Sequence, residues 1–496
     1  VEPSGEPQPF TAPDRPGAEI PVLTPGVPDE AEPPAKATAR LTIGVDVTHY
    51  RLPSSPMAYV AVVGDGGWDN AAPGREGLLE MAAAMAPRGA GERDFVAFAM
   101  ASKDIGATIG YRAELMSTAV TLSVPEDSFA EGAALLADAV MRPRFDAREW
   151  QQLVAARLES IAWDETNLGT RSWNAALDAL LPATRDAPSA RWLAGSVEAM
   201  TLDEAQAAYH RLFQPGAARF VSVGPMTIEQ VVAGLEKAFS GWEVVERGFE
   251  RKKRRPLTFG EGMRVLVVPE PGASQSLVDL VRPAPGHAEE RRAESIAVGR
   301  LLGGDFSSRL NMIIREEKGY SYGVSGGLLG NIDHGSGLYI SAPVDREHTG
   351  AALKEIIKGF ESLTRTPPTA GELNRTVTVY RTALAGVAET GSDLFATILA
   401  NHGIDMTLED HYRRQRQVTE LDLDDVRRQA GVLASLEPSL IVIAGDPAVI
   451  MPQLAGIGID AELLPARPAD AMRSGDVTAP EGEPVGGRGG GRTGGL

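Results

Sequence analysis

Several segments of this sequence recur, in altered form, at an almost constant separation. LDEAQAAYHRL begins at Leu202, and the related LDDVRRQAGVL begins at Leu423, which is 221 positions later. FVSVG, which ends at Gly224, recurs as IVIAG, which ends at Gly445, again 221 positions later. A third pair, DAREW and TAGEL, has a separation of 223. Three matches in the same order indicate a tandem duplication of units of about 220 residues.

Each unit mixes strand-like and helix-like segments. RVLVVPEP and SLVDLVRPAP, around Val265 and Leu277, are typical of strands. AEERRAESIAVGRLLGG then carries apolar residues at helical spacing and ends on Gly303 and Gly304. Because strands and helices do not alternate strictly, the pattern predicts an α+β fold with mostly antiparallel sheets and packed helices.

Composition divides the chain further. Residues 1–40 contain ten prolines and few large apolar residues, which predicts an extended leader with little packing. The basic run ERKKRRP lies between the two repeats and favours a solvated interdomain linker. The predicted segments are the leader 1–40, an N-terminal unit 41–246, the linker 247–262, a C-terminal unit 263–463 and a flexible, glycine-rich tail 464–496.

Charge and residue usage exclude several classes of function. The chain has no cysteine, which excludes disulfides, thiol nucleophiles and cysteine-ligated zinc. Its formal net charge of −19 argues against binding to nucleic acid or anionic membranes. No apolar run approaches the roughly 18 residues that a membrane-spanning helix needs. A start without Met, the proline-rich leader and the lack of cysteine favour a periplasmic or otherwise exported protein, with a cytoplasmic location as the alternative.

The segment DFSSRLNMIIREEKG, which begins at Asp305, predicts a helix. Asp305 is a suitable N-cap and Gly319 a natural terminator. The apolar residues at helical spacing predict a buried stripe made of Phe306, Leu310, Ile313 and Ile314. The chain continues as YSYGVSGGL, which predicts a strand with Tyr320, Tyr322 and Val324 on one face.

Arg315, near the end of this helix, and Tyr322, in the strand, could therefore converge. A guanidinium and a phenol present several donors and no strong base, which suits holding a peptide carbonyl and the negative charge that develops on its oxygen during hydrolysis. The alternative is structural: Arg315 caps helix carbonyls or pairs with Glu316, and Tyr322 packs in a core.

LLGGDFSSRLNMIIREEKGYSYGVSGG resembles the C-terminal signature of the pitrilysin/insulinase-type zinc peptidases, the inverzincins. In that family a glycine-rich junction leads to an Arg-x6-Tyr pair that contacts the substrate carbonyl, and Arg315 and Tyr322 occupy those positions. The resemblance covers nearly all of residues 41–463, including the duplication. It implies that the two units form half of a clam shell around a chamber.

The zinc motif of that family, HxxEH, belongs on the first long helix of the first unit. The stretch that aligns is PGREGLLEMAAAMAPRGAGERD, and its motif positions hold Glu80, Ala83 and Ala84, so both imidazoles and the general-base carboxylate are missing. Glu159 lies near the expected distal glutamate ligand, but a solvated helix carboxylate is the simpler interpretation. No two of the seven histidines are three to five positions apart. We therefore expect this chain to bind no zinc.

Some members of the family are heterodimers in which one subunit carries zinc and the other the Arg/Tyr pair. The resemblance implies a zinc-free subunit of a heterodimeric zinc endopeptidase that acts on oligopeptides. Its partner would be a homologous subunit with HxxEH and zinc, and Arg315 and Tyr322 would bind the substrate carbonyl and stabilise the oxyanion. The alternative is a catalytically inert scaffold or peptide-binding protein of the same fold. A self-sufficient peptidase would need a zinc site built from distant histidines.

Overall fold

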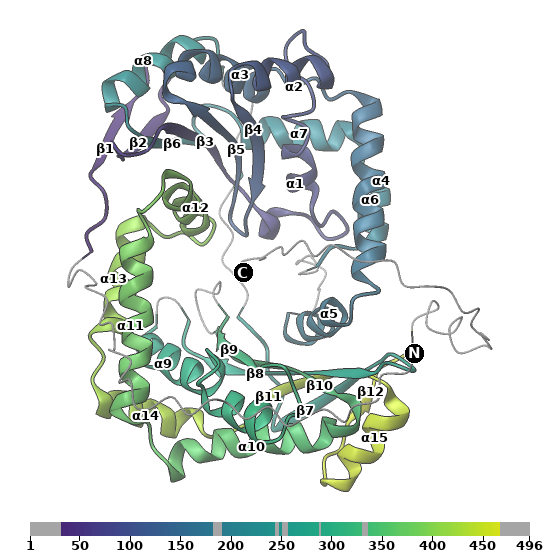
Figure 1. The fold of residues 1–496 in the computed structure, drawn as a ribbon. Helices are drawn as coiled ribbons and strands as arrows, with labels where there is room; N and C mark the ends of the chain where they lie inside the picture. The colour runs from purple at the N-terminus through teal and green to yellow at the C-terminus, as the bar shows by residue number, and fades with distance from the viewer. Residues whose placement is uncertain are drawn as a thin grey trace, which may run out of the picture.

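The computed structural model describes residues 31–181, 191–243, 248–249, 256–286, 289–329 and 336–466, and it contains two units that are each built on a six-stranded sheet (Figure 1). The strands of the first sheet are β1 (Lys36–Arg40), β2 (Asp46–Arg51), β3 (Met57–Asp65), β4 (Thr108–Ala113), β5 (Ser117–Pro125) and β6 (Ala218–Gly224). Those of the second are β7 (Met263–Pro269), β8 (Gln275–Ala284), β9 (Ser325–Leu328), β10 (Ser336–Asp345), β11 (Ser439–Gly445) and β12 (Glu462–Leu463).

The two sheets have equivalent strand orders, β1-β2-β6-β3-β5-β4 and β12-β7-β11-β8-β10-β9. The repeated sequences FVSVG and IVIAG form β6 and β11, which occupy the same place in both. Each runs parallel to one neighbour, β2 or β7, and antiparallel to the other, β3 or β8. The remaining pairs are antiparallel except β12 with β7. The predicted duplication and the α+β class with mostly antiparallel sheets are therefore confirmed.

The outermost strand of each sheet departs from the repeat. In the first unit, residues 36–40 of the predicted leader form β1, which pairs antiparallel with β2 from Lys36↔Tyr50 to Arg40↔Asp46. In the second unit the same place is taken by β12, which follows the last helix and runs parallel to β7. The last five residues of the predicted leader therefore form a strand, and the first 30 residues of the leader lie outside the described part of the chain. Most of the predicted tail, from residue 467, lies outside it as well.

Helices cover both sheets. Those of the first unit are α1 (Leu78–Ala83), α2 (Phe95–Asp104), α3 (Phe129–Met141), α4 (Ala147–Asp164), α5 (Leu168–Leu180), α6 (Ala194–Ala199), α7 (Leu202–Leu212) and α8 (Ile228–Ala238). Those of the second are α9 (Arg292–Gly303), α10 (Thr349–Arg365), α11 (Ala370–Gly386), α12 (Gly391–His402), α13 (Leu408–Thr419), α14 (Leu423–Leu433) and α15 (Pro447–Gly456), with a π-helical segment, η3 (Asn311–Glu317), after α9. Short 3-10 turns are η1 (Trp68–Asn70), η2 (Glu126–Ser128) and η4 (Arg346–His348).

Each sheet buries its two faces against different partners. One face of the first sheet packs on α1, α3, α7 and α8 of its own unit, and one face of the second packs on α9, α10, α14 and α15. Strands buried on both faces explain the nearly continuous apolar runs in FVSVG and IVIAG.

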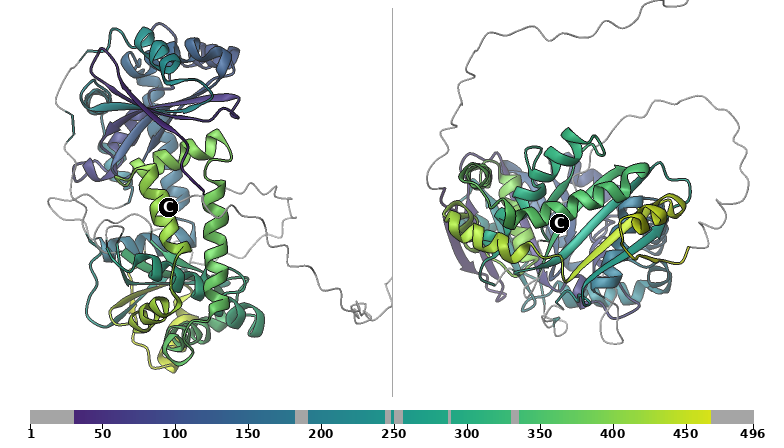
Figure 2. Two further views of the ribbon diagram at one scale, coloured as in Figure 1. Left: turned by 90° about the vertical axis from the view of Figure 1, so that its left-hand side faces the viewer. Right: turned by 90° about the horizontal axis from the view of Figure 1, so that it is seen from below.

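The other faces are covered by an exchange of helices between the units (Figure 1). α12 of the second unit packs against β3 and β6, where Leu394 and Ile398 meet Val221 and Val223. α5 of the first unit packs against β8 and β11 of the second sheet. The green helices α11 and α13 run between the two units in both side views (Figures 1 and 2). The units are therefore joined by shared cores as well as by the polypeptide chain.

The predicted linker is only partly described. Its basic residues 251–255 lie outside the described residues. Beyond them, Leu257 and Phe259 pack against the cluster between α5 and the second sheet, and the N–H of Thr258 donates to the carbonyl of Leu180 (2.8 Å). At this end of the linker two apolar side chains are half-buried, while Pro256, Thr258 and Gly260 are exposed.

Among the described residues, no single helix has the length and apolar composition of a membrane span. Helices α11 and α12 reach the length and apolar composition of a membrane span only when they are counted together, and their axes differ by 109°.

Candidate functional site

Arg315 lies in the last turn of η3. The predicted helix exists but begins later than expected, since residues 305–308 form a turn and residues 311–317 are π-helical. Leu310 and Ile314 are fully buried, as predicted. The segment ends at Gly319, whose φ of 66° requires the left-handed conformation that glycine adopts without strain. The N–H groups of Gly319 and Tyr320 donate to the carbonyls of Arg315 (3.2 Å) and Ile314 (2.9 Å).

Phe306 is not part of the buried stripe, and this prediction was wrong. Its side chain is 67% exposed because it precedes the helix: the Asp305 carboxylate accepts the N–H of Ser307 (2.9 Å) and forms a turn there, so helical periodicity does not extend back to it. The Arg315 guanidinium carbon lies 4.4 Å from the centroid of the Phe306 ring. This distance is typical of a cation–π contact, which orients the guanidinium.

The predicted strand face of Tyr320, Tyr322 and Val324 is also wrong, because β9 begins only at Ser325. Tyr320 stacks on His348, with 4.4 Å between ring centroids, and Val324 is buried, whereas Tyr322 is 89% exposed.

Two local features end the β9–β10 ladder before it reaches Tyr322. In the register that pairs Ser341 with Ser325, the residue opposite Gly323 would be Pro343, which has no N–H to donate. In addition, the Ser321 hydroxyl oxygen accepts the Gly323 N–H (3.1 Å), a local turn that competes with strand pairing.

Phe306 lies beside Arg315 and beside the backbone that follows Tyr322. One ring face carries the Arg315 guanidinium, and the ring edge lies 3.7 Å from the position that a Cβ on Gly323 would take, next to Tyr322 in the chain. Both members of the pair are open to solvent, since the Arg315 side chain is 36% exposed. The alternative in which Tyr322 packs in a core is excluded. Arg315 does pair with Glu316, at 3.5 Å, but an exposed ion pair of this kind contributes little to stability.

Glycines hold this region against the sheet. A Cβ on Gly303, near the end of α9, would lie 3.0 Å from the backbone nitrogen of Gly326 in β9, and one on Gly299 would lie 3.1 Å from the Cα of Gly327. Only glycine at these positions allows α9 to lie so close to β9. The glycine-rich junction therefore fixes the start of the Phe306 turn beside the strand that follows Tyr322.

The degenerate zinc motif lies on α1 and faces α4. Ala83 and Ala84 are buried and offer no ligand atom, while Glu80 forms an ion pair with Arg157 of α4, with 2.5 Å between Oε1 and Nη2. Burial raises the pKa of Glu80, and the Arg157 guanidinium opposes that shift. Glu159, the candidate distal ligand, is exposed.

These residues do not fit a zinc ion. The single carboxylate at the motif positions is already paired with a cation, and the Arg157 guanidinium carbon lies 4.0 Å from the ring centroid of Trp192. No cluster of three or more histidines and acidic residues that could hold a metal occurs within the described ranges. The sequence analysis missed Arg157 and Trp192, because no motif places them near Glu80.

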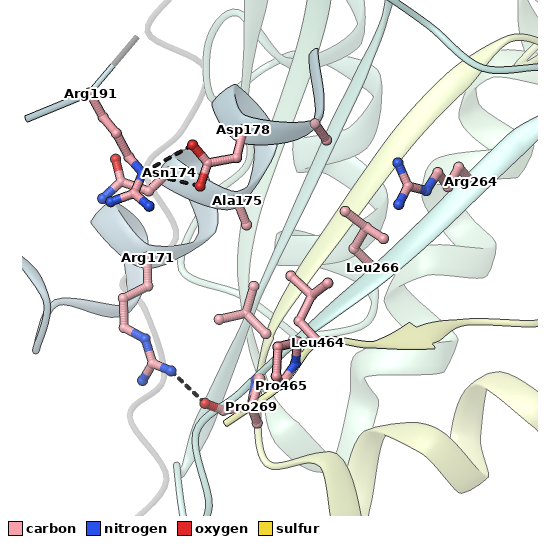
Figure 3. A pocket seen from close by; sticks show the side chains of 12 residues that line it. Arg171, Asn174, Ala175, Asp178, Arg191, Arg264, Leu266, Pro269, Leu464 and Pro465 are labelled. Carbon is pink, nitrogen blue, oxygen red and sulfur yellow. Dashed lines mark hydrogen bonds and ion pairs between the residues drawn. The ribbon is translucent and has the colours of Figure 1, made fainter. Parts of the chain in front are cut away.

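A separate cavity of about 570 Å³ lies between α5, β7 and the segment at Leu464 and Pro465 (Figure 3). The charged groups that line it are paired with carboxylates, with one another or with the backbone, and Arg264 pairs with Glu462 (2.9 Å). Arg191 Nε bonds both oxygens of Asp178 (3.0 and 3.1 Å), and Arg171 donates to the Pro269 carbonyl (2.7 Å) and pairs with Glu270. Since β7 and β9 lie toward opposite edges of the second sheet, this cavity is not continuous with the Arg315–Tyr322 region.

Comparisons with known proteins agree with the architecture. No curated protein has significant sequence similarity to the chain. A peptidase M16 inactive domain structure from Pseudomonas fluorescens matches with a TM-score of 0.70 and 20% identity, covering 83% of this chain and 98% of that one. A protease from Helicobacter pylori matches with a TM-score of 0.74 and 18% identity, covering 84% of this chain and 100% of that one.

Two further solved structures extend the comparison. The periplasmic protease PqqL from Escherichia coli matches with a TM-score of 0.67 and 14% identity, and the match covers 88% of this chain but only 52% of PqqL. A chain of Complex III2 from Candida albicans matches with a TM-score of 0.66 and 12% identity, covering 82% of this chain and 95% of that one. At these identities the structures show a shared fold. In sequence, residues 199–380 match the family described as the peptidase M16 inactive domain, which identifies this segment of the chain as a domain of that type.

Proposed function

We propose that this chain is the non-zinc-binding subunit of a heterodimeric zinc endopeptidase that degrades or processes oligopeptides. The observation that carries the proposal is that Arg315 and Tyr322 are both open to solvent, with the Arg315 guanidinium over the Phe306 ring and Gly323, the residue after Tyr322, beside the same ring. A guanidinium held over an aromatic face and a phenol that is 89% exposed are available to a ligand outside this chain.

The chemistry of the pair suits the carbonyl of a scissile peptide bond. The Arg315 guanidinium donates hydrogen bonds and carries a permanent charge, and the Tyr322 hydroxyl donates one more. Donors fixed in advance stabilise an oxygen that gains negative charge in the transition state more than they stabilise the neutral carbonyl. Neither group can activate water, so the proposal needs a homologous partner with HxxEH, whose zinc would supply a water nucleophile.

The ion pair between Glu80 and Arg157 supports the view that this chain does not supply the metal itself. Metal analysis of the purified chain tests that part: we expect well below one equivalent of zinc per chain, and a stoichiometric, tightly held zinc would contradict it.

A catalytically inert scaffold or peptide-binding protein is the second candidate. It is favoured by the similar fold of a chain in Complex III2 from Candida albicans. The two candidate functions differ in whether removing the Tyr322 hydroxyl should lower the turnover of a peptide substrate. An inert scaffold has no use for the Tyr322 hydroxyl, which makes no hydrogen bond within the described part of the chain.

The test begins with capture of the native protein and identification of its partner by mass spectrometry. For the reconstituted pair, Tyr322→Phe should lower kcat on an oligopeptide about 100-fold, the order found when one oxyanion donor is removed. Tyr59→Phe is the matched control. Tyr59 lies in β3 of the first sheet, where its ring packs on Phe395 of α12, so the substitution removes a phenolic hydroxyl away from the candidate site. Equal turnover of the wild type and Tyr322→Phe, or partners that lack HxxEH, would favour the scaffold.

We also propose a periplasmic location. It is supported by the proline-rich, cysteine-free sequence and by the shared fold with a periplasmic protease of Escherichia coli. Fractionation of the source cells, followed by detection of the chain with an antibody, checks it. Recovery with the cytoplasmic markers would contradict the proposal.

A further inference from the structure

We infer that Asn311 and Phe306 are positioning residues that hold Arg315 and Tyr322 in their working arrangement within this chain alone, before a partner subunit or a peptide binds. The catalytic consequence rests on the proposed function. The structural part, that the pair is preformed, does not.

Asn311 lies at the start of η3, four residues before Arg315, and its side chain is only 1% exposed. Its amide nitrogen donates to the Val324 carbonyl (2.7 Å), and its amide oxygen accepts the Val324 N–H (2.8 Å). The side chain thus bonds both backbone groups of one residue, as a neighbouring strand would. Val324 follows Tyr322 by two positions, so this pair of hydrogen bonds ties the segment that bears Tyr322 to the helix that bears Arg315.

The same amide nitrogen also connects the turn that carries Phe306. It contacts the Asp305 carbonyl (2.9 Å) and the Ser308 hydroxyl (3.1 Å), on either side of that residue. One buried side chain therefore joins three segments: the Phe306 turn, the Arg315 helix and the Tyr322 loop. A buried polar group whose partners are all satisfied in one arrangement rigidifies and specifies that arrangement.

Phe306 completes the connection on the outside. Its ring contacts the Arg315 guanidinium on one face and lies beside Gly323 at its edge. The ring is 67% exposed, so burial alone does not explain its place there. The contact limits the directions that the long Arg315 side chain can take, which lowers the entropy lost when it binds a carbonyl.

The loop is also fixed on the far side of Tyr322. Tyr320 stacks on His348, and the Ser321 hydroxyl bonds the Pro343 carbonyl of β10. Backbone on both sides of Tyr322 is therefore anchored, while its side chain remains exposed. Preorganised donors of this kind need no reorganisation when charge develops on a bound oxygen.

Hydrogen exchange of the isolated full-length chain tests the inference. We expect the amides of residues 323–326 to be protected in the wild type, and Asn311→Leu to accelerate their exchange about tenfold or more, since Leu keeps the volume and removes every hydrogen bond. Asn311→Asp should act in the same direction, because a carboxylate offers no N–H donor to the Val324 and Asp305 carbonyls.

Asn401→Leu is the matched control. Asn401 is 5% exposed, and its amide nitrogen bonds the Thr397 carbonyl (2.8 Å) within α12, which packs on the first sheet. Its loss should leave exchange at residues 323–326 unchanged. Rapid exchange of these amides in the wild type, or equal exchange in the wild type and Asn311→Leu, would overturn the inference.

Turnover of the reconstituted complex separates this inference from the proposed function. If the pair works as proposed, Asn311→Leu and Phe306→Leu should lower kcat with a smaller effect on KM, while complex assembly is retained. If exchange accelerates as expected but neither these variants nor Tyr322→Phe alter turnover, the positioning stands and the proposed function fails.

Discussion

Arg157 of α4 forms an ion pair with Glu80 of α1, with 2.5 Å between Nη2 of the arginine and Oε1 of the glutamate. Glu80 stands at the first position of the degenerate zinc motif, so a guanidinium now meets the carboxylate on the helix that resembles the metal-binding helix of the family. The charge pair joins two helices across 77 positions of sequence, and Trp192 lies over it. The ion pair and the contact with Trp192 therefore connect α1, α4 and the segment at Trp192 within the first unit.

Arg157→Leu should destabilise the chain by about 2–4 kcal/mol, because it leaves the largely buried Glu80 carboxylate without its cationic partner. Urea unfolding followed by circular dichroism measures the change. The control is Arg365→Leu, which removes an arginine from a largely exposed pair with Glu361 and should change stability by about 0.5 kcal/mol or less. Similar small effects from both substitutions would show that the Glu80–Arg157 pair is not structural.

The glycine contact between α9 and β9 gives a second expectation. Gly303→Ala should cost about 1–3 kcal/mol, because its Cβ would lie 3.0 Å from the backbone nitrogen of Gly326 and would force helix and strand apart. Gly431→Ala is the matched control in α14, since nothing lies within 4 Å of its added Cβ. That substitution should stabilise the chain by about 0.5–1 kcal/mol through helix propensity. Thermal unfolding of both variants measures the two effects. Midpoint temperatures that shift in the same direction for Gly303→Ala and Gly431→Ala would contradict this explanation.

Asp279 in β8 predicts a pH dependence of stability. Burial raises the pKa of its carboxyl group above the ordinary 3.8, while hydrogen bonds from Ser172 of α5 and from Ser341 oppose the shift. Between 3.8 and the raised value, the folded chain keeps a proton that the unfolded chain has lost. The contribution of Asp279 to the free energy of unfolding therefore falls as pH rises through this interval, and the penalty remains in full above it.

Asp279→Asn removes this ionisation and keeps one oxygen that can accept the Ser172 hydrogen bond. The free energy of unfolding of the variant minus that of the wild type should therefore increase as pH rises from about 4 towards neutrality. Urea titrations at several pH values measure the difference, in which groups common to both proteins cancel. A difference that is constant or that decreases with pH would contradict the shift assigned to Asp279.

The duplication made much of the fold predictable. Matching segments 221 positions apart fixed two equivalent sheets, and the helix ending at Gly303 and Gly304 lies where its apolar spacing indicated. Local patterns were less informative around the candidate site. The strand expected at Tyr320–Val324 is prevented by Pro343, a residue of another strand, and the stripe that included Phe306 assumed a helix that begins too early.

Long-range pairings could not be predicted for a physical reason. The amphipathic pattern of a helix indicates which of its faces is buried but does not indicate against which sheet. The sequence of α5 is compatible with packing on its own unit, yet Ala176 and Leu180 contact the second sheet. Likewise, no spacing rule relates Arg157 to Glu80 or Asn311 to Val324.

This exchange of helices predicts that the two units are not independent domains. A fragment of residues 263–463 lacks α5, and so would expose Val281, Leu440 and Val442 of its sheet to water. We expect it to aggregate or to bind a hydrophobic dye when expressed alone. Co-expression with residues 31–249 should restore a soluble 1:1 complex, because that fragment supplies α5 and receives α12. Size-exclusion chromatography of the separate and co-expressed fragments distinguishes the outcomes, and a soluble, monomeric, dye-negative 263–463 fragment would show that the exchanged helices are dispensable to the second core.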